Sequence, residues 1–173
     1  MVKISISDEI LAEIGKIVVV HGLIEDSLAN IIGSIVSIKT RPELGKVVTA
    51  ELSFKQLIST LSSLLTLCLG KKHECTTEFE SVKKLLYSAE QQRNLIVHSV
   101  WVNHDEPESR SVFRIKTTAK DKVGLRTQFV KLDAKEIQAI TGLVADAYAA
   151  LSLFELRFQK DDSEQNARLD AQQ

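Results

Sequence analysis

Long stretches of this chain repeat apolar residues at alternating spacings of three and four, the pattern of a helix that buries one face along its length. The first stretch begins after Ser7, an expected N-cap followed by Asp8 and Glu9, and runs to about residue 38. A helix this long with one apolar side must pack lengthwise against other helices, so the sequence predicts a helical bundle. The repeating residues are Ile10, Ile14, Ile17, His21, Ile24, Leu28, Ile31 and Ile35.

Two further helices are predicted before residue 100. One spans about 53–69, where Ser53 and Gln56 have the spacing of a capping box, and the other spans about 76–98. The segment Arg41–Gly45 is predicted to be a loop. The apolar seams of the two helices are Phe54, Leu57, Leu61, Leu64 and Cys68, and Phe79, Val82, Leu86, Ala89, Arg93 and Ile96.

Beyond His98 the apolar period changes to two, which is typical of strands and predicts a small antiparallel meander of two or three strands. A fourth helix is predicted from Asp133, with Glu136 completing a second capping box. The expected fold is therefore mainly α. It is a four-helix bundle forming one domain in residues 1–160, with a β-rich insertion at 100–132 between the third and fourth helices. A polar, disordered tail is expected at 161–173.

The composition favours a compact protein of the cytoplasm. With 173 residues, of which 44% are hydrophobic, the chain can bury a core without disulfides or metals. The N-terminal residues are too polar for a signal peptide, and no apolar run approaches the roughly 20 residues of a membrane span. A formal net charge of -1 argues against coating nucleic acid by bulk charge, so such contacts must be local. Cys68 and Cys75 are expected to stay reduced.

At the end of the third predicted helix, Arg93, Asn94 and His98 combine an arginine, an amide and an imidazole. Arginine binds phosphate with a planar charged fork, and histidine exchanges protons near neutral pH, so this trio can act on RNA without a metal. The order is arginine, four residues and histidine, with a polar residue directly after the arginine. It resembles the motif of the HEPN (higher eukaryote and prokaryote nucleotide-binding) domain family.

The resemblance to HEPN domains implies a helical bundle, a homodimer and metal-independent endoribonuclease activity, with Arg93, Asn94 and His98 as catalytic residues. It also implies that RNA enters between the protomers, and that the chain is the toxin of a toxin–antitoxin or anti-phage system with an antitoxin protein as partner. His98 would act as general base or acid when the 2'-OH attacks the phosphate, and Arg93 would stabilise charge on the phosphorane. Asn94 would orient the histidine or a phosphate oxygen. No cofactor or metal is expected.

Helix geometry separates the members of this motif. Glu90, Asn94 and His98 are four residues apart and form one polar ridge, whereas Arg93 lies about 100° around the helix from Asn94 and falls on the core seam. A charge on a core seam is costly unless it is paired. Arg93 and His98 are about 140° apart on a straight helix. Either the last turn distorts, or two copies of the motif complete one site across a two-fold axis.

Other polar residues have two interpretations each. His21 and Glu25, one turn apart, either support the motif or form a hydrogen-bonded core pair. The segment from residue 110 to residue 135 contains eight basic and two acidic residues, a net charge of +6. These cations either attract RNA or belong to a solvated hairpin. The residues expected to bind RNA are Arg110, Arg114, Lys116 and Arg126.

Two readings compete with a ribonuclease. Cys68, His73 and Cys75 resemble metal ligands, but their spacing fits no standard zinc pattern, so no metal site is predicted. The main alternative is a non-catalytic module for dimerisation or for binding a protein or nucleotide, in which Arg93 pairs with Glu25 and serves the structure alone.

Overall fold

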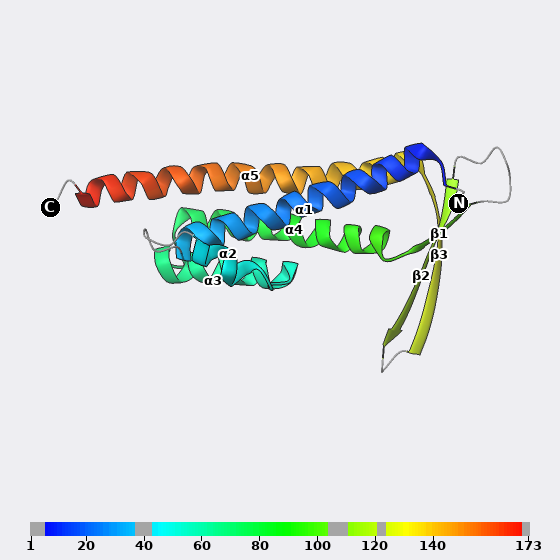
Figure 1. Ribbon diagram of the computed structural model, residues 1–173, viewed down its shortest axis with the longest axis horizontal. Helices are drawn as coiled ribbons and strands as arrows, with labels where there is room; N and C mark the ends of the chain where they lie inside the picture. The colour runs from blue at the N-terminus through cyan, green and yellow to red at the C-terminus, as the bar shows by residue number, and fades with distance from the viewer. Residues whose placement is uncertain (1–5, 37–42, 104–110, 121–123, 171–173) are drawn as a thin grey trace. The chain divides into compact units, whose positions relative to one another are not determined.

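The protein is mainly helical with one small sheet, as the sequence predicts. The computed structural model describes residues 6–36, 43–103, 111–120 and 124–170 (Figure 1). The elements in chain order are α1 (Asp8–Val36), α2 (Glu43–Thr49), α3 (Phe54–Leu69), α4 (Glu74–Val97), β1 (Val100–Asn103), β2 (Ser111–Lys120), β3 (Gly124–Asp133) and α5 (Ala134–Asp170).

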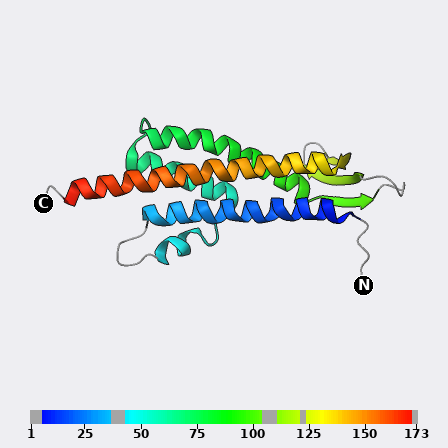
Figure 2. The same cartoon turned by 90° about the horizontal axis from the view of Figure 1, so that it is seen from above.

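Two compact units divide the chain. The first comprises residues 1–21 and 88–145, and the second comprises residues 22–87 and 146–173. The three long helices α1, α4 and α5 therefore each contribute residues to both units, and α1 and α5 are unbroken in both views (Figures 1 and 2).

Helix α5 begins where the sequence predicts but ends about ten residues later. Its start is confirmed, since the Glu136 backbone N–H donates to Asp133 Oδ1 and the Asp133 N–H donates to Glu136 Oε2, both at 2.8 Å. The expected polar tail, however, is helical as far as Asp170. Glu164, Gln165, Ala167, Arg168 and Leu169 in this segment are of types that form helices well, so the helix continues after its apolar seam ends.

Helix α2 is absent from the sequence prediction, which places a loop over Arg41–Gly45. Residues 41 and 42 lie outside the described part, and Glu43–Thr49 is helical. Gly45 signals a loop in the sequence, but in the structure it is a packing residue: a Cβ there would overlap the backbone of Gly33 on α1. By contrast, a Cβ at Gly15 or Gly22 would meet no atom within 4 Å.

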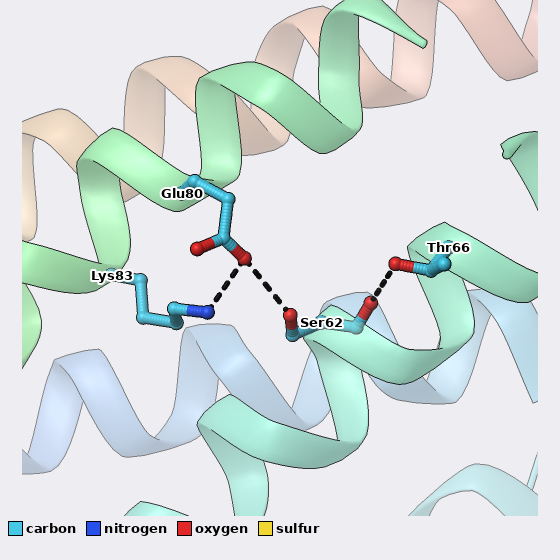
Figure 3. Close-up of polar contacts among 4 residues, drawn as sticks. All are labelled: Ser62, Thr66, Glu80 and Lys83. Carbon is cyan, nitrogen blue, oxygen red and sulfur yellow. Dashed lines mark hydrogen bonds and ion pairs between the residues drawn. The ribbon is translucent and has the colours of Figure 1, made fainter. Parts of the chain in front are cut away.

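Within the second unit, a polar contact joins α3 to α4 and an aromatic contact joins α4 to α5. Ser62 Oγ of α3 donates to Glu80 Oε1 of α4 at 3.1 Å, and Lys83 Nζ pairs with the same oxygen at 2.6 Å (Figure 3). Phe79 of α4 packs against Phe154 of α5 with ring centroids 5.3 Å apart. These contacts hold three helices of this unit together.

The buried stripe of α3 differs slightly from its predicted seam. Phe54, Leu57 and Leu61 are buried as predicted, but Cys68 is exposed. Ile58 and Leu65 are buried as well. The predicted seam repeats every 3.5 residues, whereas a straight helix has 3.6 residues per turn. Over the two heptads from Phe54 to Cys68 the seam therefore rotates away from the buried face of the helix.

The sheet lies wholly in the first unit and has the order β1-β2-β3, with both pairs antiparallel. Val100 pairs with Ile115 in β2, which in turn pairs with Phe129 in β3. One face carries the buried residues Val112 and Arg114, whereas Val100 and Phe129 are exposed on the other. Because α2 adds a helix, the insertion lies between the fourth and fifth helices.

The expectation that no apolar run is long enough for a membrane span is wrong for two helices. Asp8–Val36 and Ala134–Lys160 are long and apolar enough to cross a membrane, by length and composition alone. Residues of both, among them Ile17 and Val144, are fully buried within the protein.

Candidate functional site

The structure brings Arg93, Asn94 and His98 together within one chain. Arg93 Nη1 donates to Asn94 Oδ1 at 3.0 Å and lies 3.3 Å from Nε2 of His98. The contact forms because α4 ends at Val97, and the backbone N–H of His98 makes only a long hydrogen bond, 3.4 Å, to the carbonyl of Asn94. The long arginine side chain therefore spans the angle that separates the two residues on a straight helix.

The contact between Arg93 and His98 depends on the tautomer of the imidazole. A guanidinium nitrogen can only donate, so the pair forms a hydrogen bond with the tautomer that has its lone pair on Nε2 and its proton on Nδ1. In that tautomer the lone pair of Nε2, the atom that a general base would use, is directed at the arginine.

Side chains from the sheet fix the end of α4. Arg114 Nη1 donates to the carbonyl of Leu95 at 3.3 Å, and Lys116 Nζ donates to the carbonyl of Asn94 at 3.0 Å. Trp101 Nε1 donates to the carbonyl of Ile96 at 3.1 Å. The last carbonyls of a helix lack partners within the helix, and cations near them interact favourably with its dipole. This set of contacts positions the turn that carries His98.

Burial differs sharply across the motif. His98 is exposed, whereas Arg93 is half-buried, and its Nε is a buried atom without a hydrogen-bond partner among the described residues. An unsatisfied buried donor costs about 1–3 kcal/mol.

His21 on α1 is buried, with 3% of its surface exposed, as its place on the apolar seam predicts. Burial and, to a smaller extent, the positive charge of Arg93 lower its pKa from 6.5 to about 4. His21 is therefore electrostatically coupled to the motif arginine, and it is neutral at physiological pH.

The remaining residues predicted to support the motif or to bind RNA differ in location and in exposure. Glu90 is half-buried one turn before Asn94, and Glu25 belongs to the second unit. Arg126 is exposed on β3, and Arg110 lies outside the described residues. Arg114 is only 6% exposed, so the expectation of a solvent-facing cation is wrong at this position: its guanidinium is directed inward at the Leu95 carbonyl.

The role of β2 and Trp101 in holding α4 is what sequence reasoning missed. The alternation in β2 contains a signal, since Val112, Arg114 and Lys116 share one face and Val112 is strongly apolar. A face that begins with a buried apolar residue is directed toward the core, and cations on it need acceptors there. Helix carbonyls are such acceptors.

Metal-ligating side chains do not gather in the described part of the chain, where no three His, Cys, Asp or Glu residues are placed to hold an ion. Cys68 is exposed and Cys75 is buried. Nδ1 of His73 accepts a hydrogen bond from the backbone N–H of Cys75 at 3.3 Å, near the start of α4. These residues serve local structure.

In comparisons with known proteins, no protein family, curated protein or solved structure matches this chain.

Proposed function

We propose that this protein is a metal-independent endoribonuclease of the HEPN type. The observation that carries the proposal is the 3.3 Å contact between Arg93 Nη1 and His98 Nε2 at the exposed end of α4. A phosphate-binding cation and a proton acceptor adjoin each other there, as phosphodiester cleavage by internal attack requires.

The catalytic step begins when a phosphate of the RNA binds Arg93 and draws the guanidinium from His98. The freed Nε2 takes the proton of the 2'-OH, the 2'-oxygen bonds to phosphorus, and the bond from phosphorus to the 5'-oxygen breaks. The departing 5'-oxygen takes a proton from solvent. The products end in a 2',3'-cyclic phosphate and a 5'-hydroxyl, and DNA, which lacks the 2'-OH, is not cut.

Asn94 and the sheet position these groups. Asn94 Oδ1 accepts a hydrogen bond from Arg93 and so restricts the guanidinium before RNA binds. Lys116 is half-buried and bonded to the Asn94 carbonyl, while Arg126 is exposed on β3, where it can attract a phosphate backbone. Glu90 and His21 adjust the environment of the motif without touching RNA.

The wider context is part of the same proposal. The protein acts in the cytoplasm as a homodimer, and it is the toxin of a toxin–antitoxin or anti-phage system, partnered by an antitoxin protein. Because Arg93 and His98 meet within one chain, the reacting pair does not depend on a second copy.

A non-catalytic interaction module is the second candidate. The exposed apolar residues of the sheet, including Leu125 and Phe129, favour it, because monomeric proteins seldom leave such groups in contact with water. In that case Arg93 and His98 would close the end of α4 and bind no phosphate.

His98→Ala is the decisive variant. Since a positioned histidine contributes about 10² to 10⁴ in rate, the variant should lose detectable cleavage of single-stranded or structured RNA in the presence of EDTA. The wild type should release 2',3'-cyclic phosphate ends under the same conditions.

The matched control is His73→Ala, which removes a histidine outside the motif and should keep wild-type cleavage. Circular dichroism of both variants checks that they are folded. If wild-type protein cuts no RNA, and its expression slows growth no more than that of His98→Ala, the ribonuclease proposal fails and the interaction module replaces it.

A further inference from the structure

The two faces of the sheet have opposite surroundings. The inner face is directed at α4 through Trp101, Arg114 and Lys116. The outer face is open to water and carries a group of apolar residues, together with the exposed polar residues Thr117, Thr127 and Lys131. Its most exposed apolar residues, with their exposed fractions, are Val100 (65%), Val102 (44%), Leu125 (73%) and Phe129 (68%).

The exposed apolar area is large for a sheet of three strands. Taking about 150–200 Å² for each fully exposed side chain, these four residues leave roughly 400 Å² of apolar surface in water. That is the size of the patches by which monomers bind partners. It is also about half of the roughly 800 Å² that each protein contributes to a stable interface.

The edge of the sheet adjoins this face. β3 pairs with β2 along one side, and within the described residues no strand pairs with its other side. Between Leu125 and Phe129 the outer face of β3 carries no charge, and the strand contains no proline; its exposed cations are Arg126, on the other face, and Lys131, beyond this stretch. Edge strands are usually protected by charges or by proline, because their unpaired N–H and C=O groups can pair with strands of other molecules. The stretch from Leu125 to Phe129 has neither on its outer face.

β3 is complementary to itself about Thr127. Leu125, Thr127 and Phe129 alternate along the outer face, so a two-fold axis through Thr127 places Leu125 of each copy opposite Phe129 of the other. The same axis places Arg126 opposite Gln128, so no like charges oppose each other there. Opposed aromatic and aliphatic residues stabilise antiparallel pairs.

We propose that β3 pairs antiparallel with β3 of a second copy of this chain, centred on Thr127, and joins two sheets into one of six strands. The outer apolar faces become continuous across the axis, and the unpaired backbone groups of both edges are satisfied. This interface consists of residues of the sheet alone. Tests of the interface and tests of ribonuclease activity therefore have independent outcomes.

Disulfide trapping tests the register. The double variant Cys68→Ser/Thr127→Cys lacks the exposed native thiol of Cys68 and has a new thiol at position 127. In the proposed pairing, residue 127 of one copy lies opposite residue 127 of the other. Their Cα atoms are then about 4.5–5.5 Å apart, a distance that a disulfide can span. Mild oxidation of the full chain should convert most of it to a dimer on non-reducing gels, and a reductant should reverse this.

The matched control is Cys68→Ser/Gln128→Cys, one residue along the same exposed strand. In this register its two thiols are offset by two residues, so their Cα atoms are about 8 Å apart and a disulfide cannot form without backbone movement. Equal cross-linking of the two variants, or more in the control, overturns the proposal.

The mass of the untrapped protein provides a second readout. Light scattering of wild-type chain at about 50 µM should give twice 19.3 kDa. Phe129→Lys should give the monomer mass with an unchanged circular dichroism spectrum, and Leu67→Lys, at an exposed residue of α3, should stay dimeric. A monomeric wild type, or a Phe129→Lys variant that stays dimeric, also overturns the proposal.

Discussion

Lowering the pH from 8 to 5 should destabilise this protein through one buried residue, His21. Folding places its imidazole on the apolar seam of α1, in the field of Arg93, and both effects favour the neutral form. In the unfolded chain the pKa of His21 returns to about 6.5, whereas in the folded protein it is about 4. Between these values the unfolded state binds more protons, so acid favours unfolding.

The size of the effect follows from the two pKa values. Stability from this residue is fully present above pH 6.5, declines as the pH falls toward 4, and is lost below that. Linkage gives a loss of about 2 kcal/mol between pH 8 and pH 5. For a protein of this size that is a large part of a typical unfolding free energy of about 5–15 kcal/mol. The lowered pKa values of Glu13 and Glu80 act below pH 4.5, outside this window.

Urea unfolding followed by circular dichroism at pH 8 and pH 5 measures the effect. His21→Leu removes the titrating group and fits the apolar seam. Between pH 8 and pH 5 its unfolding free energy should therefore fall by about 2 kcal/mol less than that of the wild type. Comparing the pH dependence of variant and wild type cancels the contributions of other groups. If the two pH dependences agree within about 0.5 kcal/mol, His21 is not buried beside Arg93 as described.

Two further variants test the fold. Asp133→Ala removes the acceptor of the Glu136 N–H at the start of α5 and should cost about 1 kcal/mol in urea unfolding, whereas Lys135→Ala, at an exposed position in the same turn, should cost little. Phe79→Ala should cost about 3–5 kcal/mol, because the ring is fully buried against Phe154, and a loss below about 1 kcal/mol would contradict this packing.

The long elements were predictable because their signals are strong and local. The three-four seams placed α1, α3, α4 and the start of α5 within a few residues. Both capping boxes formed, with the Ser53 N–H donating to Gln56 Oε1 at 2.8 Å. Helix α2 was not predictable because it has only seven residues. It depends on the close approach of Gly45 and Gly33, which are distant in sequence.

The contact between Arg93 and His98 was predictable only in part. The spacing of Arg93 and His98 implied either a distorted last turn or a shared site. The end of α4 at Val97 and the length of the arginine side chain join the two residues in one chain. The inward direction of Arg114 depends on how the sheet packs on α4, and local sequence carries that information only as the alternation of β2.

Charge at the end of α4 explains how an arginine on the core seam is tolerated there. Arg93, Arg114 and Lys116 gather at a helix C-terminus, where the dipole is negative and favours cations. Arg114 and Lys116 are directed at backbone carbonyls, which lowers the cost of keeping them near each other. Arg93 Nη1 instead donates to the amide oxygen of Asn94 and lies 3.3 Å from Nε2 of His98. The proposed ribonuclease would use this same guanidinium for phosphate, because an arginine that donates to an uncharged amide can exchange that partner for an anion.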